Sequence, residues 1–498
     1  MSDIRLRFAP SPTGFVHIGS LRTVLYNFLI AKSLGGKLIL RIEDTDQKRE
    51  VLGAAEHLVQ VLDWVGIKFD EGPEIGGSFG PYIQSQRREI YDQYAERLLA
   101  TGNAYRCFCS VERIQKLKED LIVNKLPPRY DGTCRHIDSV VSAERAAKGE
   151  PFTIRQAIPT EGELVVHDEL RGDITFKVEH LEDHVLIKTD GMPTYQFANV
   201  IDDHLMEITH VVRGDEWIPS FPKNILLYRA FDWQPPKFVH IPLILNKEGG
   251  KLSKRHSDVA VEDYKVNGYL PEAMINFCTL LGWHPKGDNE ILSLPQIVAE
   301  FNINNIGISP AIFDLDKLNY FNGYYIRQLS LEDLTKKVKP YLIEANLLAE
   351  ESGDLRNNLT GDKISEIDLQ AIVGLARDRL KKLNEISELT DFIFQPKLKF
   401  EPELLMWKNF EKPVIVKNLS LVQTWLELVN ESSWNRNSLE EIVIKHIADN
   451  NLTVGEVLWP MRVALTGRKA SPGPFEVAEV LGKKSVLIRL HSAIAKLS

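Results

Sequence analysis

Two short stretches of the chain carry residues that suit phosphate chemistry. His17 and Gly19 end the segment Ala9–Ser20, in which prolines and a glycine interrupt an apolar strand before a helical pattern begins. Helix N-termini bind anions, glycine lets a ligand approach the backbone, and histidine can donate hydrogen bonds to phosphate oxygens. Lys251 and Lys254 follow a later apolar run, and their charges can neutralise a polyphosphate. Taken singly, a loop histidine and a solvated basic turn are the alternatives.

Three of the four cysteines cluster with a histidine, in a pattern typical of structural zinc. Cys107 and Cys109 form one close pair of ligands, and Cys134 and His136 form another. Four such ligands complete a tetrahedral site and leave no position for water, which favours a structural role over a catalytic one. Unrelated buried cysteines are the alternative, and Cys278 is expected in a helical core.

The elements that must position these residues read as a parallel α/β sheet built in two halves. The first half has a strand at 4–9, a loop at 10–14, a helix at 21–34 and a strand at 37–43. The second half has apolar alternation at 195–201, a strand at 210–213, a helix at 225–231 and an apolar run at 239–245. Helical spacing begins near residue 270 and dominates from about residue 329 onward.

Composition excludes several classes of protein. The formal net charge of −9 does not indicate a nucleic-acid binder, so any RNA contact requires cations gathered locally. The first residues do not resemble a secretory signal, and no apolar run is long enough to span a membrane. Four cysteines in a chain of 498 residues do not make a disulfide framework. We expect a cytoplasmic, multidomain protein, and the absence of a GxxxxGK[ST] sequence argues against a P-loop NTPase.

The two phosphate-type stretches together resemble a known family. His17-Ile-Gly-Ser20 and Lys251-Leu-Ser-Lys254 resemble the two signatures of class I aminoacyl-tRNA synthetases. Residues 7–14 (RFAPSPTG) and 41–46 (RIEDTD) resemble bacterial-type glutamyl-tRNA synthetases in particular. The resemblance runs over nearly the whole chain and includes residues 471–475 (SPGPF). Ser20, Leu252 and Arg255 depart from the class-wide pattern, as is known in the glutamyl branch.

The resemblance implies a set of site residues. The implied glutamate pocket comprises Arg7, Ala9, Ser11, Glu43, Tyr195, Asn199, Arg213 and Trp217. The implied ATP site comprises His17, Gly19, Glu216, Lys251 and Lys254, with His17 and the two lysines as catalytic residues. The chemistry agrees, because the arginines suit the two carboxylates of glutamate and Glu43 suits its ammonium group. Arg213 is our candidate reader of the side-chain carboxylate, since a buried guanidinium pairs with a carboxylate but cannot satisfy an amide equally.

The resemblance also implies the organisation of the chain: a Rossmann-type α/β catalytic domain with a zinc-containing insertion, followed by all-helical anticodon-binding domains. We predict the first catalytic half at 1–81, an acceptor-end-binding insertion at 82–194, the second catalytic half at 195–255, a helical stem-contact domain at 256–328, and anticodon-binding domains at 329–385 and 386–498. The implied partners are tRNA-Glu, L-glutamate and ATP with Mg²⁺, together with one structural Zn²⁺. We expect a monomer with no membrane contact.

Four alternatives accompany this interpretation. A ligase that also charges tRNA-Gln would share every feature above. A truncated transferase that modifies queuosine on tRNA would lack the long helical region after Leu329. A glutaminyl enzyme would usually end in a β-barrel region, where this chain has a helical pattern. A noncatalytic tRNA-binding paralogue would be expected to have damaged nucleotide signatures, whereas His17, Lys251 and Lys254 are intact.

Overall fold

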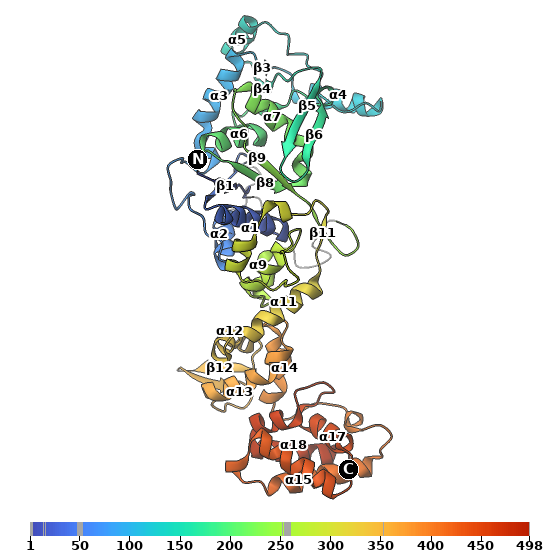
Figure 1. Ribbon diagram of the computed structural model, residues 1–498. Helices are drawn as coiled ribbons and strands as arrows, with labels where there is room; N and C mark the ends of the chain where they lie inside the picture. The colour runs from blue at the N-terminus through green and yellow to red at the C-terminus, as the bar shows by residue number, and fades with distance from the viewer. Residues whose placement is uncertain are drawn as a thin grey trace. The chain divides into compact units, whose positions relative to one another are not determined.

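The structure is a computed structural model that describes residues 3–12, 14, 16–46, 53–250, 252, 260–351 and 353–497. The chain divides into two compact units, one of residues 1–265 and 271–315, the other of residues 266–270 and 316–498. Figure 1 shows the first unit from blue to yellow and most of the second from yellow to red. Within the described ranges, no helix has both the length and the apolar character needed to cross a membrane.

A six-stranded sheet forms the centre of the first unit, in the order β2-β1-β8-β9-β5-β6 (Figure 1). Its strands are β1 (Arg5–Phe8), β2 (Lys37–Leu40), β5 (Glu163–Asp168), β6 (Gly172–Lys177), β8 (His210–Gly214) and β9 (Lys237–Ile241). All neighbouring pairs are parallel except β5 and β6, which form an antiparallel hairpin. All four residues of β1 are buried, as expected for an inner strand of a parallel sheet. The predicted Rossmann-type fold is confirmed.

Helices cover this sheet and connect its strands. They are α1 (Ile18–Ser33), α2 (Ala54–Trp64), α3 (Arg88–Ala100), α6 (Tyr195–Leu205) and α7 (Phe221–Ala230). His17 caps α1, because its side chain accepts a hydrogen bond from the Ser20 amide. Tyr26 of α1 donates its hydroxyl hydrogen to the backbone oxygens of Thr279 and Leu281, which fastens α1 to the segment that ends α9 (Pro271–Thr279).

Three expectations about these elements were wrong or incomplete. Residues 195–201 belong to helix α6, because Phe197, Ala198 and Val200 with their neighbours pack one helical surface into the core. A short apolar alternation is compatible with either element, and tertiary burial decides between them. Residues 163–177, inside the range predicted for the insertion, form β5 and β6 and extend the central sheet. The C-terminal region is not all helical, since it contains a hairpin of β12 (Leu348–Glu351) and β13 (Asp354–Asn357).

A second, three-stranded sheet lies within the segment predicted as the insertion. Its antiparallel strands are β3 (Ala104–Cys107), β4 (Thr153–Gln156) and β7 (Val185–Ile187). Helices α4 (Val111–Val123) and α5 (Ser139–Ala147) lie between β3 and β4 along the chain. The remaining short elements of this unit are β10 (Ile244–Leu245), α8 (Val261–Val266), α10 (Leu294–Glu300) and β11 (Ala311–Ile312).

The second unit is built mainly of helices. They are α11 (Leu315–Gln328), α12 (Leu331–Glu344), α13 (Glu366–Ala376), α14 (Glu385–Phe394), α15 (Lys412–Glu427), α16 (Arg436–Asp449), α17 (Val454–Thr466) and α18 (Pro474–Leu497). One hydrophobic core draws on α12, α13 and α14, and another draws on α15 to α18. Helix α14 contributes to both cores, with Phe394 in the first and Phe392 in the second. The predicted division near residue 385 stays a prediction.

Candidate active site

A cavity of about 680 Å³ opens where β1 and β8 end. Ligands bind at this edge in parallel α/β sheets. The cavity is lined by Arg7, Ala9, Ser11, His17, Gly19, Glu43, Tyr195, Arg213, Glu216 and Trp217, all predicted as site residues. Asn199 stands behind the cavity wall, where its side-chain amide donates to Glu43 Oε1 at 3.0 Å. Lys251 and Lys254 lie outside the described residues, but Leu252 between them lines the cavity.

The N-terminus of α1 forms the phosphate-type side of the cavity. The Ser20 amide donates to His17 Nδ1 at 3.1 Å, so the imidazole carries its proton on Nε2 when it is neutral. A Cβ atom at Gly19 would lie 3.0 Å from two atoms of the same ring, so glycine keeps this position open for the imidazole. The protonated Nε2 of His17, which lies 3.1 Å from Ser20 Oγ, the N-terminus of α1 and a glycine together suit an anionic ligand.

Arg7 reaches the cavity from a buried network of charges. Its Nε donates to Asp203 Oδ1 at 3.0 Å, and Arg41 Nη1 pairs with the same oxygen at 2.8 Å. Arg41 Nη2 pairs in turn with Glu43 Oε1 at 3.0 Å. Burial acts to raise the pKa of Asp203, but Arg7 and Arg41 outweigh it and the pKa is lowered. The ionised Asp203 therefore holds Arg7 in place, since a buried charge is tolerated when it is well paired.

Glu43 presents one unpaired oxygen inside the protein. Its Oε1 accepts hydrogen bonds from Arg41 and Asn199, whereas the buried Oε2 has no hydrogen-bond partner among the described residues. Burial is the chief cause of the raised pKa of Glu43, although Arg41 and Arg7 oppose it. An unpaired buried carboxylate oxygen is costly. A cationic ligand group in the cavity would remove that cost.

Arg213 presents the complementary feature, a buried guanidinium without a carboxylate. It is 5% exposed and forms no ion pair with any carboxylate of the described ranges. Its Nε donates to His240 Nε2 at 2.9 Å, its two Nη atoms make long contacts of 3.4 and 3.5 Å with Asn224 Oδ1, and the Tyr195 side chain is a further hydrogen-bond partner of the guanidinium. Burial chiefly lowers the pKa of Arg213. The fork is therefore suited to an incoming carboxylate.

Comparison with known proteins identifies the family. The family described as "tRNA synthetases class I (E and Q), catalytic domain" matches residues 3–320, and an anticodon binding domain matches residues 333–494. A glutamate–tRNA ligase of Clostridium botulinum is 44% identical over 100% of this chain and 99% of its own length. One of Dehalococcoides mccartyi is 40% identical over 100% of this chain and 98% of its own length. The chain belongs to the glutamate–tRNA ligases of class I.

A solved structure agrees with this assignment. The crystal structure of a glutamate tRNA ligase from Elizabethkingia meningosepticum, in complex with its amino acid, matches this ligase with a TM-score of 0.89. The two chains are 33% identical, and the match covers 100% of each. The predicted family and class of enzyme are confirmed.

Sequence reasoning missed several buried residues of the ligase that support the cavity. Asp203 and Arg41 form the network behind Arg7, and His240 with Asp168 stands behind Arg213. The available signal was weak: Arg41 lies in the motif of residues 41–46, and Asp203 is the second of two adjacent aspartates that follow the apolar residues Val200 and Ile201. Their partners are distant along the chain, so their contacts are not readable from local spacing.

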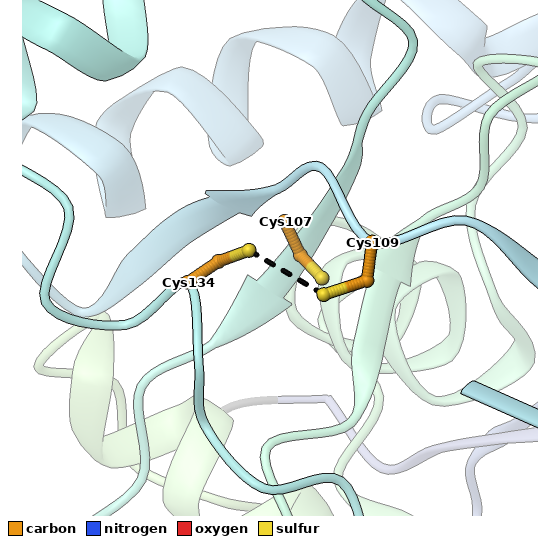
Figure 2. Close-up of side chains that lie close together, drawn as sticks. All are labelled: Cys107, Cys109 and Cys134. Carbon is orange, nitrogen blue, oxygen red and sulfur yellow. Dashed lines mark hydrogen bonds between the residues drawn. The ribbon is translucent and has the colours of Figure 1, made fainter. Parts of the chain in front are cut away.

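Three of the four cysteines gather at the end of β3 (Figure 2), whereas Cys278 is buried in α9. The sulfur atoms of Cys107, Cys109 and Cys134 all lie within 4.8 Å of one another, and Cys109 Sγ lies 3.6 Å from Cys134 Sγ. His136 is exposed and is not part of this group. The Tyr130 hydroxyl lies 3.4 Å from Cys107 Sγ and 3.7 Å from Cys109 Sγ, a neighbour that the sequence did not reveal. Three convergent thiols are a donor set that fits zinc.

The surroundings of these thiols favour the thiolate form of Cys107. Burial acts to raise the pKa of Cys107, but hydrogen bonding with Tyr130, the Cys109 amide and Arg155 outweighs it, and the pKa is lowered. A thiolate is the form of cysteine that binds metal. The cluster is therefore compatible with Zn²⁺.

Proposed function

We propose that this synthetase joins L-glutamate to the 3′-terminal adenosine of tRNA-Glu. The α-carboxylate of glutamate attacks the α-phosphorus of ATP, which forms glutamyl-adenylate and releases pyrophosphate. A ribose hydroxyl of the terminal adenosine then attacks the acyl carbon, which forms the ester and releases AMP. The likeness to glutamate–tRNA ligases over the full chain supports this proposal.

One observation carries the assignment of glutamate as the amino acid. A single cavity contains a buried carboxylate oxygen that lacks a donor among the described residues, on Glu43, and a buried guanidinium that lacks a carboxylate there, on Arg213. Glutamate supplies both missing partners, an ammonium group for Glu43 and a side-chain carboxylate for Arg213. Arg7, held by Asp203, is then the second cation of the site. Ala9, Ser11, Tyr195 and Trp217 enclose the same volume.

Selectivity against glutamine follows from the lack of an ion pair between Arg213 and any described carboxylate. Glutamine has almost the shape of glutamate, but its amide offers one acceptor oxygen beside a donating NH2 group and carries no charge, so it can neither pair with the fork through two oxygens nor neutralise the guanidinium. Sites that require a specific polar partner discriminate by roughly four to five orders of magnitude. The absence of an ion pair to a described carboxylate leaves the guanidinium dependent on the substrate for its counter-charge.

We assign the nucleotide to the side of the cavity formed by the N-terminus of α1. We assign His17, Gly19 and Glu216 to ATP, because all three line the cavity and His17 and Gly19 lie at the N-terminus of α1; the role of Glu216 follows from the family resemblance. By the family resemblance, Lys251 and Lys254 are assigned to the α-phosphorus of ATP, which is pentacoordinate in the transition state. Mg²⁺ would accompany ATP and supply charge neutralisation. Positioning and charge neutralisation provide most of the rate in such reactions.

Lys254→Ala tests the assignment at the ATP side. The variant is expected to lower turnover by about 100-fold or more, as removal of a charge that stabilises a transition state does. Glutamate KM should change far less, because Lys254 is assigned to the α-phosphorus of ATP and not to glutamate. Glutamate-dependent ATP–pyrophosphate exchange, measured with tRNA present, gives both constants, and near-normal turnover would contradict the assignment.

ATP–pyrophosphate exchange tests the function as a whole. Glutamate should support exchange by the purified protein, glutamine should not, and omission of tRNA should suppress the reaction. Transfer of labelled glutamate to tRNA-Glu then reports the second step. Exchange with another amino acid, or none with glutamate and tRNA together, would overturn the proposal.

The same proposal extends to the rest of the chain. We assign residues 82–194 to the acceptor end of the tRNA, residues 256–328 to its stem, and residues 329–385 and 386–498 to the anticodon. Cys107, Cys109 and Cys134 would hold one structural Zn²⁺. The sequence pattern offers His136 as the fourth ligand, but we assign Tyr130 to that position because its hydroxyl lies 3.4 and 3.7 Å from two of the sulfur atoms. We further propose that the protein acts in the cytoplasm as a monomer.

A further inference from the structure

A line of three buried residues leads away from the substrate cavity. Arg213 Nε donates to His240 Nε2 at 2.9 Å, and the other ring nitrogen of His240 lies 2.7 Å from Asp168 Oδ2. The Asp168 and His240 side chains are fully buried. The line crosses three neighbouring strands, β8, β9 and β5, so it is part of the central sheet.

Hydrogen bonding defines the tautomer of His240. A guanidinium nitrogen only donates, so His240 Nε2 must be the acceptor and carries no proton. The proton of the neutral ring is therefore on Nδ1 and is donated to Asp168. Asp168 is itself held firmly, because its Oδ1 accepts from the amides of Leu170 and Arg171 and its Oδ2 also accepts from the His240 amide.

Aromatic rings pack against Arg213 and His240 and shield them from water. The Arg213 guanidinium carbon lies 5.2 Å from the ring centroid of Phe238 and 5.8 Å from that of Phe221. The His240 ring packs against Phe221 at a centroid distance of 4.9 Å. Hydrogen bonds and charges act more strongly where water is excluded.

We propose that His240 and Asp168 are positioning residues that orient Arg213 toward glutamate and so set the preference for glutamate over glutamine. This inference rests on the proposed function. A carboxylate in direct contact with Arg213 would occupy the fork and compete with the substrate. The interposed imidazole instead takes only Nε, so the negative charge of Asp168 is placed one residue away. The other partners of the guanidinium, Asn224 and Tyr195, are neutral, and no described carboxylate competes with the ligand for the Nη atoms. The β5–β6 hairpin, through Asp168, thus contributes to amino-acid selection.

Two substitutions at one position test the proposal. His240→Gln retains an acceptor near the position of Nε2, whereas His240→Leu removes it. We expect His240→Leu to raise glutamate KM by about tenfold or more, because the loss of a partner to a buried charge is costly. Its kcat and its ATP KM should stay close to wild type, and its preference for glutamate over glutamine should fall by a similar factor. His240→Gln should recover most of the loss.

The readouts separate this role from a merely structural one. A general loss of folding would lower the amount of active enzyme, and so the apparent kcat, without changing glutamate KM, so a selective rise in glutamate KM with rescue by His240→Gln supports the proposal. Unchanged glutamate KM and unchanged preference in His240→Leu would overturn it. Absence of glutamate-dependent exchange in the wild type would instead overturn the proposed function, so the two failures are distinguishable.

A measurement on the unsubstituted protein covers the case in which His240→Leu does not fold. Histidine-selective ¹⁵N labelling and comparison with the His240→Gln spectrum would identify the ring signals of His240. We expect a neutral imidazole protonated on Nδ1 at neutral pH. A proton on Nε2, or a doubly protonated ring, would exclude acceptance from Arg213 and overturn the proposal.

Discussion

Glu43 and Arg213 are two incomplete charge pairs placed in one cavity. Each is buried, and each would be more stable with a partner that the described chain does not supply. The protein is therefore less stable than it would be if both charges were fully paired. In the proposed site, glutamate would supply both missing interactions, and its binding energy would depend directly on its chemical identity.

Glu43→Gln tests the ammonium role at the residue scale. The substituted amide side chain would keep an acceptor for Arg41 and Asn199 but would lose the negative charge. We expect glutamate KM to rise by about 10- to 100-fold, as the loss of a charged hydrogen-bond partner costs about 1.5–3 kcal/mol. The ATP KM, measured in the same exchange assay, should not change. A normal glutamate KM in this variant would assign the ammonium group to another residue.

The raised pKa of Glu43 gives a second prediction, with a definite sign. Binding of the ammonium group requires the carboxylate, so glutamate KM should rise as pH falls through the raised pKa of Glu43. The inflection should lie above the ordinary glutamate pKa of about 4.3, and it should be absent in Glu43→Gln. Folding has the opposite dependence: the folded chain binds this proton more tightly than the unfolded chain, so protonation stabilises the fold as pH falls. Steady-state kinetics across the acid range provides the measurement.

Arg213→Ala tests the selection of the side-chain carboxylate. We expect kcat/KM for glutamate to fall by about 100-fold or more, because removal of a buried charge partner costs about 2–5 kcal/mol. The kcat/KM for glutamine should not fall, so the preference should largely disappear. Arg213→Lys is the matched control, since it keeps a charge but loses the planar fork. A retained preference in Arg213→Ala would place selection elsewhere.

At the scale of elements, the site depends on where strands end. β1 supplies Arg7 and β8 supplies Arg213, and both strands run parallel in the same sheet. Helix α1 starts directly after β1 and the following loop, which places His17 and Gly19 at the same edge. The β5–β6 hairpin reaches the site differently, through the side chain of Asp168 behind β9.

The small β3-β4-β7 sheet gives a metal prediction at the same scale. Metal analysis of gently purified protein should show one zinc per chain, and Cys134→Ser should remove it. His136→Ala should retain zinc, because His136 is exposed and outside the group of thiols. Tyr130→Phe should lose zinc to a chelator about tenfold more readily than the wild type, as supporting residues of a metal site do when changed. Zinc loss in His136→Ala with retention in Tyr130→Phe would return His136 to the ligand set.

At the scale of the whole molecule, the net charge of −9 means that tRNA contact must use local groups of cations. The anticodon-binding match at residues 333–494 falls within the second compact unit, and the catalytic match covers the first. The catalytic match and the anticodon-binding match therefore fall in regions with separate hydrophobic cores.

Aminoacylation assays test whether local groups of cations bind the tRNA and which tRNA is charged. The protein should charge a tRNA-Glu transcript with glutamate, and the KM for tRNA should rise by about tenfold or more between roughly 50 and 200 mM salt. Glutamate KM should change little, because buried charges are weakly screened. A tRNA KM that is insensitive to salt would contradict phosphate contact as the main source of affinity. A tRNA-Gln transcript serves as the comparison, and equal charging of it would identify the non-discriminating form.

Local features of this protein were readable from its sequence because they depend on nearby residues. The loop before α1, the glycine beside His17, the parallel strands and the clustered cysteines follow from chain chemistry and periodicity. Even so, Arg7 could have been an exposed edge residue. Its burial became evident only when β1 was found between β2 and β8.

Only the tertiary structure shows which residues are hydrogen-bond partners in the site. Arg7 and Asp203 are 196 residues apart, and His240 and Asp168 are 72 residues apart, so no local pattern could pair them. It likewise placed Tyr130 among the thiols and left His136 exposed, although His136 has the better spacing in sequence. The physical reason is common to these cases: the order of strands in a sheet and the burial of a side chain depend on the packing of distant segments, and residue spacing does not encode them.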